Sequence, residues 1–195
     1  MSDNAIHVSA GDAPLVDRSA EGGKPVTVRR GMALARLAFR GDAVAAGKAG
    51  AAFGASLPLH PLAANCVGDR AALWLGPDEW LLLARPEGSE PANLDALARE
   101  TFAGIEAALE GVTHSLVDVS ERNVSLMIEG AGAADLLNAN VFLDLSLEAF
   151  PVGHVTRTLF SKAEIVLWRT GEESFVLECW ASFAPYVEGH LAEAA

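Results

Sequence analysis

Short stretches of alternating hydrophobic and polar residues recur along the chain, and this alternation predicts a series of β-strands. In residues 33–40, Arg36 and Arg40 interrupt apolar residues, as in a strand that buries one face. Three further stretches with strand-like composition follow, separated by turn-forming residues: 62–67, 71–75 and 80–84. The first half of the chain is therefore expected to contribute at least four strands.

Two stretches of the first half show helical periodicity instead. Residues 43–53 are rich in alanine and follow Asp42, a suitable N-cap. Residues 93–109 carry their large apolar side chains on one helical face: Leu94, Leu97, Ala98, Phe102, Ile105 and Leu109. Together with the strands, the first half predicts the order β-α-β-β-β-α.

The second half repeats this order after a bridging strand at residues 114–120. Its predicted elements are strands and helices at residues 124–130, 131–137, 155–160, 164–169, 174–180 and 183–192. Gly41 and Gly130 end equivalent strands 89 positions apart, and Leu75 and Trp168 are 93 positions apart. We therefore predict an α+β fold with mostly antiparallel sheets, made of two half-repeats at about residues 30–110 and 112–195, in a single domain spanning residues 26–195.

The first 25 residues differ from the rest of the chain. They are rich in glycine, serine, aspartate and alanine, show no clear periodicity, and lack the basic start and apolar run of a signal peptide. We predict a flexible N-terminal arm at residues 1–25, either inert or ordered on a partner. No apolar stretch reaches the length of about 18 residues that a membrane span needs, so a cytoplasmic protein is expected.

The composition narrows the class of function. The chain has 14 basic and 26 acidic residues, a formal net charge of −12, which disfavours binding to nucleic acid and to anionic membranes. Cys66 and Cys179 have no second cysteine at metal-binding spacing, and we favour two buried, reduced thiols over a disulfide. The five histidines are scattered singly, so a metal site would require ligands from distant parts of the chain to converge.

Familiar catalytic motifs are also missing from the sequence. It contains no Gly-x-Ser-x-Gly and no phosphate-binding loop, and the pair Gly130 and Gly132 is more typical of a tight strand-to-helix turn than of a dinucleotide site. Residues 118–122 form the densest polar cluster beside a strand. Either Arg122 orients a carboxylate ligand, or Asp118 and Ser120 satisfy backbone donors in a strand-end turn and Arg122 pairs with Asp118.

Two other features leave alternatives open. Arg157 interrupts the predicted strand 155–160, where it either faces solvent or turns inward to pair with Glu164 or Glu178. The aromatic-rich run at residues 180–187 is suited to an interface, although burial within the monomer is the commoner outcome.

Several segments, taken together and in order, resemble the gamma subunit family of heterotetrameric sarcosine oxidase. They are residues 73–82, 117–122, 143–146, 150–153, 157–158, 162–169 and 182–184. No single segment is specific, but the ordered set is. The match is looser at residues 138–142, where the family often has a Gly-Cys-Pro-like segment and this chain has Asn-Ala-Asn-Val-Phe.

The resemblance implies a fold similar to the folate-binding domain of aminomethyltransferases, itself an internally duplicated unit. It further implies a complex that oxidatively demethylates sarcosine to glycine and passes the one-carbon unit to tetrahydrofolate. FAD, FMN, NAD and tetrahydrofolate are then expected on partner subunits, and none in this chain. The alpha subunit is the expected direct partner, with beta and delta subunits in the same complex.

The resemblance also implies that folate-type chemistry has been lost here. Aminomethyltransferases carry a catalytic aspartate in a hairpin that corresponds by position to residues 162–167, where this chain has Ile165, Val166 and Leu167. We therefore expect a docking subunit with no catalytic or metal-binding residue. The alternatives are a free-standing folate-binding enzyme, with Arg157, Glu164 and Glu178 as weak candidates for cofactor binding, and a homodimeric structural protein.

Overall fold

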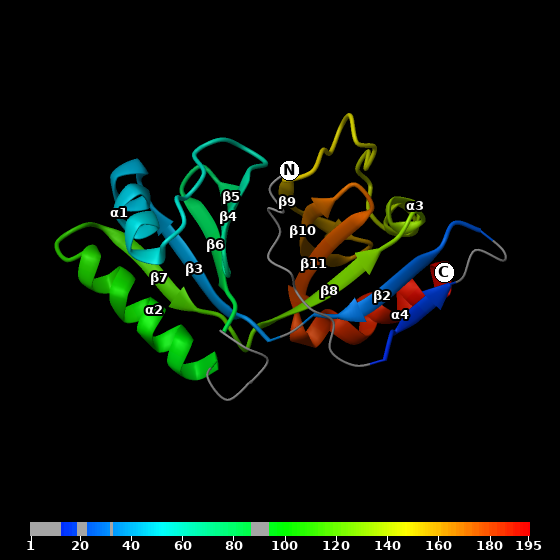
Figure 1. Cartoon of the computed structure of the whole chain (residues 1–195), viewed down its shortest axis with the longest axis horizontal. Coiled ribbons are helices and arrows are strands. Elements are labelled where there is room, and N and C mark those ends of the chain that lie inside the picture. Colours follow the sequence, from blue (N-terminus) through cyan, green and yellow to red (C-terminus); the bar gives the residue numbers. More distant parts are fainter. Residues whose placement is uncertain (1–12, 19–22, 32, 87–93) are drawn as a thin grey trace. The chain divides into compact units, whose positions relative to one another are not determined.

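The computed structural model describes residues 13–18, 23–31, 33–86 and 94–195, and these fall into two compact units (Figure 1). Unit 1 contains residues 33–120, and unit 2 contains residues 121–195 together with the described residues before residue 32. Each unit is built on one sheet, and every strand pair within the described residues is antiparallel.

Unit 1 has a five-stranded sheet in the order β4-β5-β6-β3-β7. The strands are β3 (Ala35–Gly41), β4 (Ala64–Val67), β5 (Arg70–Gly76), β6 (Glu79–Ala84) and β7 (His114–Asp118). Helices α1 (Ala43–Phe53) and α2 (Leu94–Ala108) pack on one face, where Phe39, Trp80 and Ile105 are fully buried. The predicted N-cap is confirmed, because the Asp42 carboxylate accepts a hydrogen bond of 2.8 Å from the Ala45 backbone N–H.

Unit 2 has a six-stranded sheet in the order β1-β2-β8-β11-β10-β9. The strands are β1 (Val16–Arg18), β2 (Val26–Arg30), β8 (Asn123–Glu129), β9 (Val155–Phe160), β10 (Ala163–Gly171) and β11 (Ser174–Trp180). Helices α3 (Ala133–Asn138) and α4 (Ala184–Ala194) cover one face, and a short 3-10 turn, η2 (Ala181–Phe183), precedes α4. The core on this face is apolar, with Phe160, Phe175 and Leu177 fully buried.

The two sheets confirm the predicted duplicated α+β fold. The order β4-β5-β6-β3 in unit 1 corresponds to β9-β10-β11-β8 in unit 2. The pairing register shifts between Trp74 and Gly76 in one hairpin and between Arg169 and Gly171 in the other, at positions 95 residues apart. With this offset, Trp168 corresponds to Leu73 and not to Leu75. The offset is larger than the 89 residues between Gly41 and Gly130 because the connection from helix to strand is longer in the second copy.

Two strands, β2 and β7, each lie just before one copy of the repeat in the chain but pair in the sheet of the other copy. β2 precedes β3 in the chain but pairs with β8, whereas β7 precedes β8 but pairs with β3. β7 falls within the half-repeat predicted at residues 112–195, yet its pairing places it in unit 1. Each sheet therefore includes a strand from outside the half-repeat that supplies most of its strands.

Part of the predicted arm also belongs to unit 2. β1 lies within residues 1–25 and pairs with β2, with Val16 in the apolar core, and the Arg18 guanidinium donates to the Ala195 carbonyl at 2.8 Å. Residues 1–12 and 19–22 lie outside the described residues. The flexible arm and the single domain of residues 26–195 stay predictions.

His114 of β7 connects that strand to α2. Its Nδ1 lies 2.8 Å from the Val112 carbonyl oxygen, and its Nε2 lies 3.1 Å from the Glu106 carboxylate. The hydrogen bond to Val112 raises the pKa of His114 above its ordinary value, burial opposes this, and Glu106 adds to the rise. Because Nδ1 donates to a carbonyl, only the protonated ring also offers a proton to Glu106 at Nε2.

We expect Glu106→Gln to lower the pKa of His114, as measured by NMR titration of the ring protons. The raised pKa stabilises unit 1 fully below the ordinary histidine pKa, and this contribution is lost as pH rises through the raised value. The stability difference between wild type and variant should therefore be largest in mild acid and vanish in mild alkali. Glu100→Gln, on the exposed side of the same helix, is the control and should leave the titration unchanged.

Candidate functional site

The three polar residues predicted as weak folate-type candidates lie on one face of the unit 2 sheet. Val166 on β10 is paired with Arg157 on β9 and with Glu178 on β11, and directly paired residues share a face. Glu164 precedes Val166 by two residues and therefore points to the same side. The opposite face of these strands carries the apolar core. The structure thus brings all three candidates to one face of adjacent strands.

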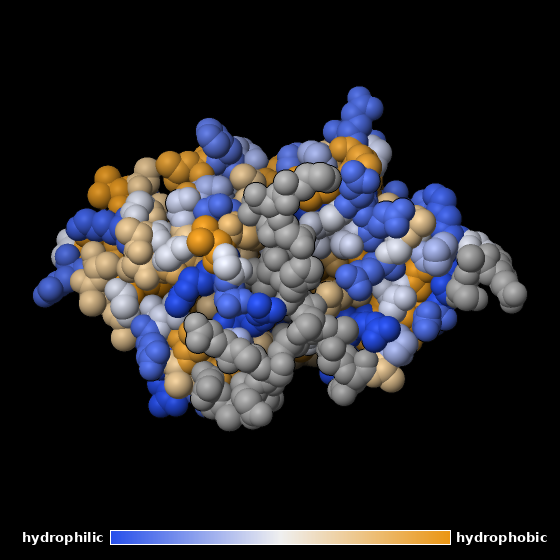
Figure 2. All heavy atoms as spheres, viewed as in Figure 1, coloured by the Kyte–Doolittle hydropathy of each residue, from blue (hydrophilic) through white to orange (hydrophobic). Residues whose placement is uncertain are grey.

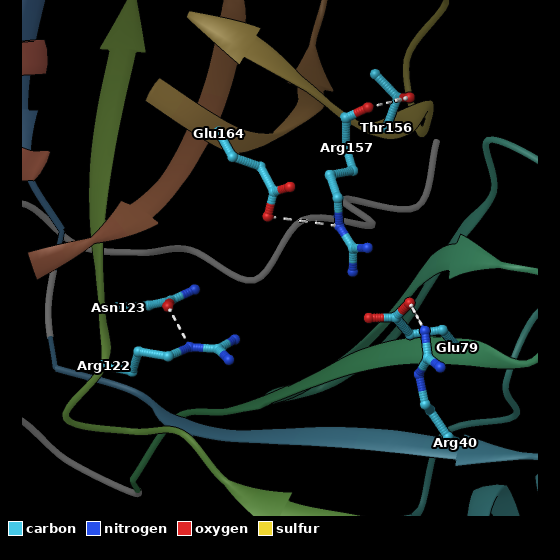
Figure 3. A network of polar contacts seen from close by, with 7 residues as sticks. All are labelled: Arg40, Glu79, Arg122, Asn123, Thr156, Arg157 and Glu164. Carbon is cyan, nitrogen blue, oxygen red and sulfur yellow. Dashed lines mark hydrogen bonds and ion pairs between the residues drawn. The ribbon is translucent and has the colours of Figure 1, made fainter. Parts of the chain in front are cut away.

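Arg157 faces solvent, which is one of the two predicted alternatives, and not inward, although it does form a loose ion pair with Glu164 (Figure 3). The Arg157 Nε and Glu164 Oε1 atoms are 4.0 Å apart, and the side chains are 34% and 56% exposed. The Arg157 backbone carbonyl also accepts a hydrogen bond of 3.3 Å from the Thr156 hydroxyl. An exposed pair of this kind contributes about 0–1 kcal/mol, so it is a poor fold determinant, and both groups face solvent.

Glu178 has a different environment. Its side chain is buried, and its carboxylate accepts a hydrogen bond from the hydroxyl of Ser125, the residue directly opposite on β8. A buried carboxylate is costly unless hydrogen bonds replace those made to water. The hydrogen bond from Ser125 therefore links the central strands β8 and β11 and gives the Glu178 carboxylate a partner within the protein.

Residues 165–167, which the resemblance equated with part of the aminomethyltransferase catalytic hairpin, are apolar residues of β10. Ile165 and Leu167 on β10 belong to the core beneath the helices, and Val166 lies on the opposite face between Arg157 and Glu178. Aliphatic side chains can neither carry charge nor exchange a proton. The expected loss of folate-type chemistry stays a prediction.

The polar cluster at residues 118–122 forms a strand-end turn. The Asp118 carboxylate accepts from the Ser120 backbone N–H at 2.9 Å and from the Ser120 hydroxyl at 2.6 Å. The Ser120 hydroxyl oxygen in turn accepts from the Arg36 backbone N–H at 2.9 Å. These contacts support the structural interpretation of Asp118 and Ser120 over a ligand site.

Arg122, which follows this turn, is in contact with residues of unit 2. Its Nε donates to the Asn123 side-chain oxygen at 3.1 Å (Figure 3), and its guanidinium lies over the Trp180 ring, 5.7 Å from the centroid. Trp180 also contacts Phe183 of η2, with ring centroids 6.0 Å apart. Arg122 thus stacks on the exposed ring of Trp180, which in turn contacts Phe183. Its pairing with Asp118 stays a prediction.

The loop that leads from α3 to β9 exposes apolar side chains that the sequence did not single out. Within residues 142–152, called the 142–152 loop below, Phe142 is 85% exposed. Other large apolar side chains of the loop are also exposed: Leu143, Leu147 and Val152. Residues Val141, Leu145 and Phe150 alternate with them and are buried in the unit 2 core. The loop is therefore anchored on one side and apolar on the other.

The buried side chain of Arg169 on β10 forms hydrogen bonds with the backbone of this loop. Its Nη1 donates to the carbonyl oxygens of Leu145 at 2.9 Å and Phe150 at 2.8 Å, and its Nη2 donates to the backbone carbonyl oxygen of Glu172 at 2.6 Å. The guanidinium also lies 4.6 Å from the centroid of the Phe175 ring. Burial lowers the pKa of Arg169, and the charge of Glu172 opposes this shift. A buried cation with this many acceptors fixes the loop backbone.

The loop adds hydrogen bonds of its own. The Asp144 carboxylate accepts from the Ser146 backbone N–H at 2.9 Å, and the Phe150 N–H donates to the Ser146 carbonyl at 2.9 Å. The hydrogen bond from the Ser146 backbone lowers the pKa of Asp144, so this exposed acid is ionised at neutral pH. The loop combines a fixed backbone with negative charge beside its apolar side chains.

Two classes of site are not found within the described part of the chain. No group of three or more histidine, cysteine, aspartate or glutamate side chains there is arranged to hold a metal ion. Among the same residues, no helix combines the length and apolar character needed for a membrane crossing. Of the cysteines, Cys179 is buried and Cys66 is half-buried.

Comparison with known proteins places this arrangement in a family. Residues 40–195 match the model of the sarcosine oxidase, gamma subunit family. A sarcosine oxidase subunit gamma from Corynebacterium sp. (strain U-96) is 31% identical over 176 residues, covering 89% of this chain and 80% of the relative. A second, from Corynebacterium sp. (strain P-1), is 34% identical over 144 residues, covering 73% and 66%, respectively.

Solved structures agree with this assignment. A chain of the heterotetrameric sarcosine oxidase from Corynebacterium sp. U-96 superposes with a TM-score of 0.79 and 29% identity, over 91% of this chain and 86% of that one. The aminomethyltransferase T of the glycine cleavage system from Bartonella henselae superposes with a TM-score of 0.54 at 16% identity, covering 81% of this chain and 43% of that one, and confirms the predicted fold. The chain therefore belongs to the sarcosine oxidase gamma subunit family.

Proposed function

We propose that this chain serves as the gamma subunit of a heterotetrameric sarcosine oxidase. The match to the gamma subunit family over residues 40–195 carries this proposal. The complex would oxidatively demethylate sarcosine to glycine and transfer the one-carbon unit to tetrahydrofolate. The superposition on a chain of a heterotetrameric sarcosine oxidase supports the same assignment.

Within that complex, the chain would act as a docking and stabilising subunit without catalytic residues of its own. This follows from the apolar residues Ile165, Val166 and Leu167 in the hairpin where aminomethyltransferases carry their acid. It is also consistent with Glu178, whose carboxylate is engaged by Ser125.

Cofactors and partners follow from the same proposal. FAD, FMN, NAD and tetrahydrofolate would bind to partner subunits, the alpha subunit would contact this chain directly, and the beta and delta subunits would complete a cytoplasmic complex. The net charge of −12 is consistent with a protein partner and disfavours nucleic acid.

Affinity purification tests the proposal. The tagged chain, co-expressed with candidate alpha, beta and delta subunits of the same organism, should yield a stable yellow complex that oxidises sarcosine. The same chain expressed alone should be colourless and inactive toward sarcosine. Failure to co-purify with any of these subunits, together with turnover of an amine by the isolated chain, would overturn it.

A titration separates this function from the free-standing folate-binding enzyme. Isothermal calorimetry of the isolated chain with tetrahydrofolate should show no saturable heat if folate binds only to a partner subunit. Saturable binding in the micromolar range that is abolished in the variant Arg157→Ala would instead favour the enzyme alternative. Arg30→Ala, which removes another exposed arginine of unit 2 that pairs with a glutamate, is the matched control.

A further inference from the structure

The 142–152 loop displays more apolar surface than its fold requires. Phe142, with 85% of its surface exposed, buries little of its side chain within the described residues, and Leu147 and Val152 are about half exposed. The loop is drawn in yellow at the top right of Figure 1, and in the same region Figure 2 shows hydrophobic side chains beside hydrophilic ones. Clusters of exposed large apolar residues with a polar surround are typical of protein interaction sites.

The loop is also fixed before any partner arrives. The buried side chains of Val141, Leu145 and Phe150 anchor it, and Arg169 binds the carbonyl oxygens of the latter two. A segment whose backbone is already ordered loses less conformational entropy on binding than a flexible one. A pre-ordered loop with an outward phenylalanine therefore has the properties of an interface anchor.

The acidic residues of the 142–152 loop indicate what kind of surface would bind it. Residues 141–154 contain Asp144 and Glu148 and no lysine or arginine, so the apolar side chains have an acidic border. Since the whole chain carries a net charge of −12, a second copy or an anionic membrane would be repelled. The complementary surface is an apolar pocket bordered by lysine or arginine side chains, on a different protein.

We propose that the 142–152 loop docks into such a pocket on another subunit of the complex, with Phe142 as its central anchor. The inference rests on the proposed function, because membership of the gamma subunit family supplies the hetero-oligomeric partner. Glu148, at the border of the apolar side chains, would face basic residues of the pocket and speed association.

Affinity measured by biolayer interferometry between this chain and the separately purified remaining subunits tests the proposal. Phe142→Asp should raise Kd by about thirtyfold or more, the range expected for a central interface anchor. Leu147→Asp should also weaken binding, and Glu148→Lys should lower the association rate in low salt. The matched control is Val44→Asp in α1, which places the same charge at another exposed apolar position, in unit 1, and should leave Kd unchanged.

The outcomes distinguish this inference from the function on which it rests. If wild type binds and Phe142→Asp, with an unchanged circular dichroism spectrum, binds equally well, the loop is not the docking site and the proposed function stands. If wild type does not bind any subunit, both fall. If light scattering shows that wild type self-associates and Phe142→Asp does not, the loop contacts a second copy, and the inference is overturned.

Discussion

Replacing Arg169 with methionine should lower the free energy of unfolding by about 3 kcal/mol, because buried acceptors lose their donor. The carbonyl oxygens of Leu145 and Phe150 depend on the Arg169 Nη1, and the Phe175 ring loses its cation–π contact. Methionine keeps the apolar length of the side chain, so the loss reports on the guanidinium. Urea unfolding followed by circular dichroism measures the effect.

The control is Arg157→Met, the same substitution on the neighbouring strand of the same sheet. Arg157 is partly exposed and pairs with Glu164 at 4.0 Å, so its loss should change stability by less than about 1 kcal/mol. Equal, small effects at both positions would show that water replaces the Arg169 donors, and the loop would then not depend on it. A large effect at Arg169 should be accompanied by weaker binding to the other subunits, although Arg169 itself is buried.

The duplicated fold could be predicted because local patterns specify most of its elements. Alternation and turn residues gave the observed bounds of β9 (Val155–Phe160) and β11 (Ser174–Trp180), and the N-cap at Asp42 placed the start of α1. The same cues recur in the second half, so the repeat was visible without any tertiary information.

The first two strands were missed for a physical reason. β1 and β2 are only three and five residues long, and β2 is stabilised by pairing with β8, about 100 residues later in the chain. Pairing of this kind is non-local, so neither composition nor periodicity reports it. The sequence therefore contains no signal for β1, which forms the edge of the unit 2 sheet within the predicted arm, and the arm as a whole stays a prediction.

Candidate residues were predictable to different degrees. Arg157 and Glu164 stand out because they interrupt apolar strands, whereas the contact between Glu178 and Ser125 depends on the register of β11 and β8. The 142–152 loop has neither helical nor strand periodicity, so its exposed phenylalanine is unremarkable in sequence. Its ordering by Arg169 arises only when β10 places the guanidinium beneath it.

Replacing Gly130 with alanine should destabilise unit 2 by about 3 kcal/mol, because the backbone and its neighbours both exclude a side chain. Gly130 directly follows β8 and has a φ of +113°, a conformation that favours glycine, and an added Cβ would lie 2.5 Å from the Pro25 carbonyl oxygen. The clash falls at the start of β2 (Val26–Arg30), so relieving it displaces the strand that lies between β1 and β8 in the unit 2 sheet.

Gly189→Ala in α4 is the matched control within the same unit. Nothing lies within 4 Å of a Cβ added there, and alanine in a helix is favoured over glycine by about 0.5–1 kcal/mol, so this variant should be slightly stabilised. Urea unfolding compares the two variants, and hydrogen exchange of the β2 amides locates the change. If Gly130→Ala keeps both stability and β2 protection, the tight junction between β8 and β2 is not needed for the sheet. Loss of β2 protection in Gly130→Ala would instead show that β2 depends on the second copy even though it leads into the first.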